Sequence, residues 1–177
     1  ARHEGVIPWD DDMDFAVSLK DRDKLLSLKD ELAAVGIGIA PVAAYRVGPI
    51  KIPFQGWKKH LSKLYLLDRP NNASYSSWSW PFIDIFYYSE KGDTIVIPDP
   101  KGPISISKAD FFPLKTNLFE GIPISIPNKI DPILSDEFGN DWEEVCASSG
   151  MNHRRERIQR SGHTALCKNV TGSSPTK

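Results

Sequence analysis

The sequence predicts an α+β domain in which helices pack on a mixed β-sheet. Short runs of β-branched and aromatic residues occur beside two segments that are typical of helices, and strands and helices do not alternate regularly, which disfavours a doubly wound parallel sheet. The 14 prolines disfavour a helical bundle, because proline interrupts helices. Hydrophobic residues make up 40% of the chain and charged residues 25%, as in an ordinary folded domain, and no apolar run is long enough to cross a bilayer.

The first elements are a strand followed by a helix. Pro8 and the aspartates after it indicate a turn, and we expect a strand from about Met13 to Leu19. Residues 21–35 are predicted to form a helix, with Asp21 as its N-cap and Gly36 after its end. The residues that recur at helical spacing are Leu25, Leu28, Leu32 and Val35.

The remaining segments predict short strands and one more helix. β-prone residues predict strands at 43–47, 50–54, 80–88, 94–97 and 122–126, with a loop by composition at 68–77. Residues 131–142 are predicted to contain a helix that ends near Gly139, with Pro132 in its first turn. From Met151 on, apolar residues are few and the chain is basic, so we expect it to fray or to be disordered.

The overall charge is nearly balanced. The formal net charge of -1 removes a long-range attraction to nucleic acid or to an anionic membrane. The basic run at 153–160 is typical of a solvated helix face or tail, and no aromatic residues are interleaved with it for stacking on bases. We therefore expect no nucleic-acid partner.

Two cysteines and two glycosylation sequons bear on the compartment. Cys146 and Cys167 fit either one disulfide or two free thiols. The sequons begin at Asn72 and Asn169, and such short motifs often arise by chance.

The acidic segment before the first strand is a candidate metal site. Its aspartates are Asp10, Asp11, Asp12 and Asp14. On an extended chain Asp12 and Asp14 share a face, roughly 6–7 Å apart, and Asp10 joins them if the strand begins early. Neighbouring carboxylates repel each other, and a bound Mg²⁺ or Mn²⁺ would relieve that repulsion. The alternative is an acidic turn in water; the apolar neighbours of Asp14 favour the metal site.

Asp84 is a second candidate, because it lies in the apolar segment Phe82-Ile83-Asp84-Ile85-Phe86. A buried carboxylate needs an ion pair or a metal. The alternatives are a salt bridge to Lys or Arg and a solvated face of the strand. Two aspartates on one strand and a third on another are typical of metal-dependent phosphoryl-transfer sites. The sequence thus predicts Asp12, Asp14 and Asp84 as catalytic metal ligands, with Asp10 as a further ligand.

The segment Arg2-His3-Glu4-Gly5-Val6-Ile7-Pro8-Trp9-Asp10-Asp11-Asp12-Met13-Asp14 resembles the signature of the LicD family. That family includes bacterial phosphocholine transferases and the animal fukutin-related ribitol-phosphate transferases. Later blocks resemble further motifs of the family in the same order, and they lie at residues 80–86, 112–114, 119–122, 126–128 and 138–142. The resemblance therefore spans about residues 2–142.

The resemblance implies a fold, a domain division and a set of site residues. It implies a nucleotidyltransferase-like mixed sheet flanked by helices at 1–142, followed by a partly disordered C-terminal extension at 143–177. It places Asp12, Asp14 and Asp84 at the metal, and Arg2 or His3 at a donor phosphate. The family carries a glycine-rich turn upstream of the first motif, so we also expect an N-terminally truncated domain.

The resemblance further implies a reaction. A phospho-alcohol group, such as phosphocholine or ribitol phosphate, would pass from a CDP-linked donor to a glycan hydroxyl, with Mg²⁺ or Mn²⁺ and release of cytidine monophosphate. The alternatives are a true nucleotidyltransferase and an inactive relative that binds a glycan or a protein partner. We expect a Golgi-type lumenal location and membrane attachment only through a segment upstream of this chain.

Overall fold

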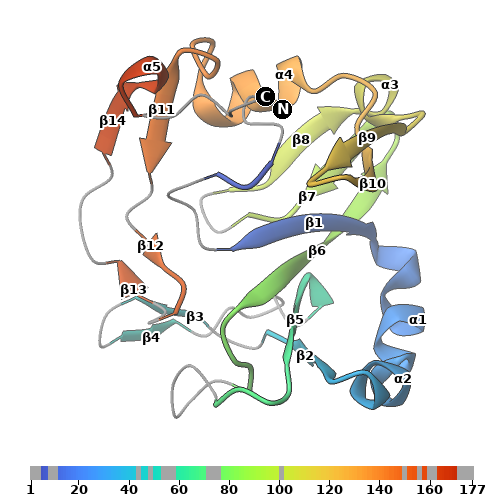
Figure 1. Ribbon diagram of the computed structural model, residues 1–177. Helices are drawn as coiled ribbons and strands as arrows, with labels where there is room; N and C mark the ends of the chain where they lie inside the picture. Colours follow the sequence, from blue (N-terminus) through green and yellow to red (C-terminus); the bar gives the residue numbers. More distant parts are fainter. Residues whose placement is uncertain are drawn as a thin grey trace. The chain divides into compact units, whose positions relative to one another are not determined.

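The structure is a computed structural model and is shown in Figure 1. It describes residues 5–7, 12–42, 45–47, 50–52, 59–70, 77–99, 102–148, 151–154, 157–158 and 163–170. The chain divides into two compact units. The sheet unit consists of Asp11–Ser105 and Met151–Gln159, and the hairpin unit of Ala1–Asp10, Ile106–Gly150 and Arg160–Lys177.

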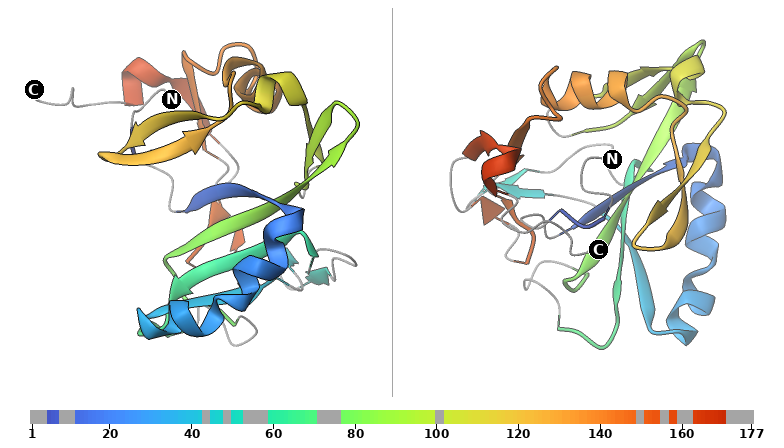
Figure 2. Two further views of the ribbon diagram at one scale, coloured as in Figure 1. Left: turned by 90° about the vertical axis from the view of Figure 1, so that its right-hand side faces the viewer. Right: turned by 45° about the horizontal axis from the view of Figure 1, so that its top comes forward.

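A six-stranded sheet forms the centre of the sheet unit and is mainly antiparallel. Its strand order is β2-β5-β6-β7-β8, and β1 pairs with β6 in parallel (Figures 1 and 2). The strands are β1 (Met13–Ser18), β2 (Ile37–Pro41), β5 (Leu61–Leu66), β6 (Phe82–Lys91), β7 (Thr94–Ile97) and β8 (Ile104–Ser107). This mixed sheet agrees with the predicted α+β class.

Strand β6 organises the sheet because it is long enough to pair with three neighbours. Its first part lies between β1 and β5, and its last residues, from Ser89, form a hairpin with β7 around Gly92. Gly92 has a φ of +58°, which favours glycine at this turn. Tyr87 is fully buried, and its hydroxyl donates to Ser62 Oγ at 3.1 Å, which ties β6 to β5.

The core of the sheet unit lies next to the β5–β6 pair. Its buried cluster consists of Val42, Leu61, Trp78 and Phe82, and Tyr65, Trp80 and Phe86 pack against it. The aromatic segment that precedes β6 therefore contributes to the core as well as to the strand. A further short pair, β3 (Tyr45–Val47) with β4 (Ile50–Ile52), matches two predicted strands, apart from their ends.

The predicted helix at 21–35 is present but divided. The structure has the 3₁₀ turn η1 (Leu19–Asp21), then α1 (Arg22–Ser27) and α2 (Lys29–Ala34), with Leu28 between the two helices. Asp21 precedes α1, but its side chain makes no capping hydrogen bond. Instead, Ser18 Oγ accepts from the Lys20 N–H, so the cap lies at η1. Gly36 has a φ of +80° and follows the helix as expected.

Among its described residues, the hairpin unit has two strand pairs and three helices. Antiparallel pairs form between β9 (Lys115–Phe119) and β10 (Ile122–Ile126), and between β11 (Val145–Ser148) and β14 (His163–Leu166). The helices are α3 (Lys108–Phe111), α4 (Asp131–Phe138) and α5 (Cys167–Val170). Strand β10 and helix α4 were predicted, and Pro132 lies in the first turn of α4. The other elements lack a period strong enough to predict them.

Part of the segment from Met151 on, which was expected to fray or to be disordered, forms strands among the described residues. Strands β12 (Met151–Asn152) and β13 (Arg157–Ile158) pair in the sheet unit, and β14 pairs with β11 in the hairpin unit. Cys146 and Cys167 form a disulfide, which resolves the alternative left open by the sequence. No helix among the described residues is long and apolar enough to cross a membrane.

Candidate metal centre

Three strands align the charged residues of the site in one row. The register of β1 with β6 places Asp14 opposite Asp84, and that of β5 with β6 places Lys63 opposite Asp84. Residues in register across neighbouring strands project to the same face of a sheet. The row Asp14–Asp84–Lys63 is therefore a consequence of strand pairing.

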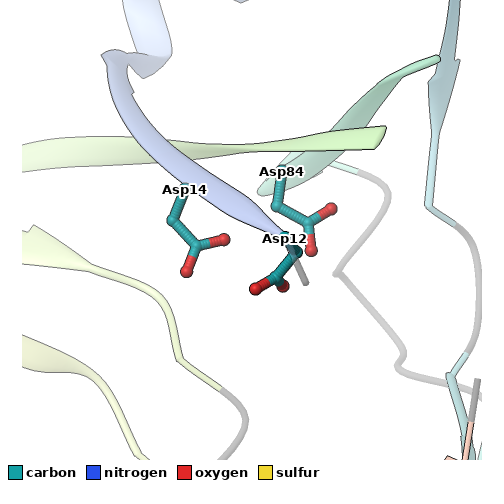
Figure 3. Close-up of side chains that lie close together, drawn as sticks. All are labelled: Asp12, Asp14 and Asp84. Carbon is teal, nitrogen blue, oxygen red and sulfur yellow. The ribbon is translucent and has the colours of Figure 1, made fainter. Parts of the chain in front are cut away.

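The three predicted aspartates gather on this face. Asp12 precedes β1, Asp14 is its second residue, and Asp84 comes from β6 (Figure 3). One carboxylate oxygen of each residue lies within 4.8 Å of the others. The structure thus brings Asp84 together with Asp12 and Asp14, from which it is remote in sequence, as the strand alternation and the apolar setting of Asp84 predicted.

This spacing fits a divalent cation. Oxygen ligands at about 2.1 Å from Mg²⁺ lie at most about 4.2 Å apart, and Ca²⁺ accepts longer contacts. Ligands in adjacent octahedral positions lie only about 3 Å apart, so a cation would draw the carboxylate oxygens together by up to about 2 Å. The donor set is all oxygen, the chemistry that Mg²⁺ and Mn²⁺ prefer.

A buried ion pair holds Asp84. Lys63 Nζ lies 2.7 Å from Asp84 Oδ1 and 2.9 Å from Oδ2. Lys63 is 0% exposed and Asp84 is 2% exposed, so the pair is shielded from water. The salt bridge that the sequence offered as the alternative to a metal is therefore present, and it coexists with the carboxylate cluster. The ammonium neutralises one buried carboxylate and fixes its orientation.

Aromatic rings surround the other side of this ammonium. Lys63 Nζ lies 3.4 Å from the centre of the Phe82 ring and 5.5 Å from that of the Trp78 ring. Ring faces attract cations, so they partly replace the lost hydration of the lysine. Sequence reasoning missed Lys63. Lys63 could have been predicted because it is a single cation in the otherwise uncharged strand Leu61–Leu66, the same kind of pattern that indicated Asp84.

Asp12 contacts a residue from the C-terminal part of the chain. His153 Nε2 lies 3.0 Å from Asp12 Oδ2, and the two side chains are 13% and 11% exposed. The imidazole also meets the Phe82 ring edge to face, with 6.0 Å between ring centres and 86° between planes. Sequence reasoning missed His153 because the segment around it was expected to be disordered.

Asp14 differs from the other two aspartates because it is exposed. The apolar neighbours in β1 were taken to place it in a buried setting, and this interpretation is wrong: Phe15 and Ala16 are exposed too. Asp14 belongs to the cluster because of its register with Asp84, not because of burial.

The described groups leave the site negative. Three carboxylates and one ammonium carry two net negative charges when His153 is neutral, the charge that one divalent cation balances. Asp10 and Asp11 lie outside the described residues, as do Arg2 and His3, the expected contacts to donor phosphate.

Comparison with known proteins identifies a family for most of the chain. Residues 1–129 match the model of the family described as LicD/FKTN/FKRP, nucleotidyltransferase domain. No curated protein matches the chain. The matched region includes Asp12, Asp14, Lys63 and Asp84, whereas His153 lies beyond it. The match covers well over half of the sequence, and the chain belongs to the LicD family.

Proposed function

We propose that this protein is a metal-dependent transferase that moves a phospho-alcohol group from a CDP-linked donor to a glycan hydroxyl. Family membership indicates a phospho-alcohol transferase. The observation that supports the finer proposal is the cluster of Asp12, Asp14 and Asp84, whose carboxylate oxygens lie within 4.8 Å of one another. A nucleotidyltransferase-like fold is part of the same proposal.

The three aspartates have different roles in the proposed metal centre. Asp12, Asp14 and Asp84 would hold Mg²⁺ or Mn²⁺, and a bound cation would bind phosphate oxygens of the donor and stabilise charge on the leaving group. Asp84 is held by Lys63 inside the sheet, so it provides a fixed ligand. Asp14 is exposed, so it provides the ligand on the side from which a donor can approach.

The proposed reaction breaks the bond between the donor's phospho-alcohol phosphorus and the oxygen that bridges to cytidine monophosphate. The acceptor hydroxyl oxygen loses its proton and forms the new bond to that phosphorus, and cytidine monophosphate leaves with the electrons of the broken bond. A true nucleotidyltransferase would cleave the same donor so that the nucleotide remains on the acceptor. The mass of the acceptor after reaction therefore distinguishes the two activities.

The proposed location is the lumen of the secretory pathway, of the Golgi type. The disulfide between Cys146 and Cys167 supports it, because disulfides persist in oxidising compartments. The sequon at Asn169 is consistent with it, since Asn169 is exposed. This compartment is also where glycan acceptors would be met.

Thermal unfolding of the chain with and without Mn²⁺ and CDP tests the metal centre. A ligand at about 100 times its Kd stabilises the folded state by about 2.7 kcal/mol. We expect Mn²⁺ to raise the Tm of the wild type and the Asp14→Asn variant to lose the increase with its fold intact, because Asp14 is exposed.

Asp93→Asn is the matched control, since Asp93 is an exposed aspartate in the β6–β7 turn of the same unit. It should respond to Mn²⁺ like the wild type. An equal response in Asp14→Asn would remove Asp14 from the centre, and no response in the wild type would contradict metal binding. Release of cytidine monophosphate from a CDP-linked alcohol should likewise fail in Asp14→Asn.

A further inference from the structure

We propose that His153 is a positioning residue of the metal centre: it fixes the carboxylate of Asp12, so that the hairpin β12–β13, beyond the matched family region, completes the site. The inference rests on the proposed function, and it adds a residue that neither the sequence motifs nor the family match includes.

The contact itself is well placed for this role. His153 Nε2 and Asp12 Oδ2 are 3.0 Å apart, and both side chains are largely shielded from water. A protonated Nε2 at this distance would donate to that carboxylate oxygen. The other oxygen of Asp12 would then be available to ligate a cation.

Asp12 needs such a contact more than the other two aspartates do. The β1–β6 ladder begins at Met13, so Asp14 and Asp84 lie within paired strands whereas Asp12 precedes them. Asp84 is held further by Lys63. The orientation of Asp12 therefore depends on its side-chain contacts, and His153 provides one of them.

The hairpin holds His153 by contacts that do not involve the carboxylates. Its two strands pair through Met151 with Ile158 and Asn152 with Arg157, and β13 lies beside β3. The imidazole packs against Phe82. The guanidinium of Arg154, the next residue, lies 5.6 Å from the centre of the Trp80 ring. His153 and Arg154 thus contact the segment that leads into β6 and carries Asp84.

Phe82 connects the two supporting residues. Its ring contacts Lys63, which holds Asp84, and also His153, which contacts Asp12. One buried aromatic side chain therefore supports two of the three carboxylates. Hydrogen-bonded partners of metal ligands typically contribute about 10–100-fold to metal affinity.

The test is the affinity for Mn²⁺, measured by titration of the whole chain with electron paramagnetic resonance of free Mn²⁺. His153→Phe keeps an aromatic ring against Phe82 but removes the N–H, and we expect its Kd to rise about 10–100-fold. His153→Gln retains an amide N–H and should recover most of the affinity. Asp93→Asn, at an exposed aspartate in the β6–β7 turn of the same unit, is the matched control and should bind Mn²⁺ like the wild type.

The outcomes separate this inference from the proposed function. Wild-type affinity in His153→Phe overturns the role of His153 while leaving the metal centre in place. An equally large loss of Mn²⁺ affinity in His153→Gln also overturns it, because a side-chain N–H donor would then not account for the affinity. If the wild type binds no Mn²⁺, the metal dependence of the proposed function fails first. His153→Leu, which also lacks the N–H, provides the same comparison if His153→Phe does not fold.

Discussion

Removing the charge of Lys63 is the sharpest test of how the centre is built. Lys63→Met keeps a long apolar side chain at a fully buried position and removes the ammonium next to Asp84. Breaking a buried ion pair on one side costs about 3–5 kcal/mol, because the remaining charge is left without compensation. That is a large share of the about 5–15 kcal/mol that stabilises a typical domain.

Comparing Lys63→Met with Asp84→Asn shows whether the loss in the free energy of unfolding comes from the ion pair. Asp84→Asn leaves the ammonium of Lys63 buried without its partner carboxylate, so we expect it to lose a similar amount. The double variant Lys63→Met with Asp84→Asn should recover most of the loss. The free energies of unfolding come from denaturant titration of the four proteins.

Mn²⁺ should stabilise Lys63→Met more than it stabilises the wild type, whereas most variants of a metal site respond less to the metal. Without the ammonium, the cluster of Asp12, Asp14 and Asp84 carries an additional net negative charge, and a divalent cation compensates it. Mn²⁺ should therefore raise the Tm of Lys63→Met more than that of the wild type. Losses in the two single variants that simply add in the double variant, or a smaller Mn²⁺ effect in Lys63→Met, would refute this reasoning.

Two further predictions concern stability away from the centre. Replacing both Cys146 and Cys167 with serine opens a loop with a sequence separation of 21 residues. The free energy of unfolding, measured by denaturant titration, should fall by about 3 kcal/mol. A fall below about 1 kcal/mol would contradict this contribution of the disulfide. Burial raises the pKa of Tyr88 above its ordinary value of 10.0, so the folded state favours the neutral phenol. The sign follows by linkage: stability is intact below pH 10.0 and falls as the pH rises through the higher pKa of the folded state. Tyr88→Phe should flatten this fall in plots of Tm against pH, and an unchanged slope would exclude Tyr88 as its source.

The sequence by itself determined the parts of the site that depend on local pattern. Strand alternation put Asp12 and Asp14 on one face, and a single carboxylate in the apolar run Phe82–Phe86 indicated that Asp84 is buried. These inferences need only the period of a strand and the cost of a buried charge. The same reasoning failed for the exposure of Asp14, because the burial of a residue depends on what covers its face of the sheet.

Only the tertiary structure decided which other residues meet these carboxylates. Lys63 faces Asp84 because β5 pairs with β6 in one register, and a shift by one residue would turn the lysine to the opposite face. His153 contacts Asp12 from a segment with too few apolar residues to predict that it is ordered. Contacts of His153 with Phe82 and of Arg154 with Trp80 hold this segment in place. Local sequence sets the period and the charge, whereas long-range strand pairing sets the partners, because no local preference encodes a register between distant strands.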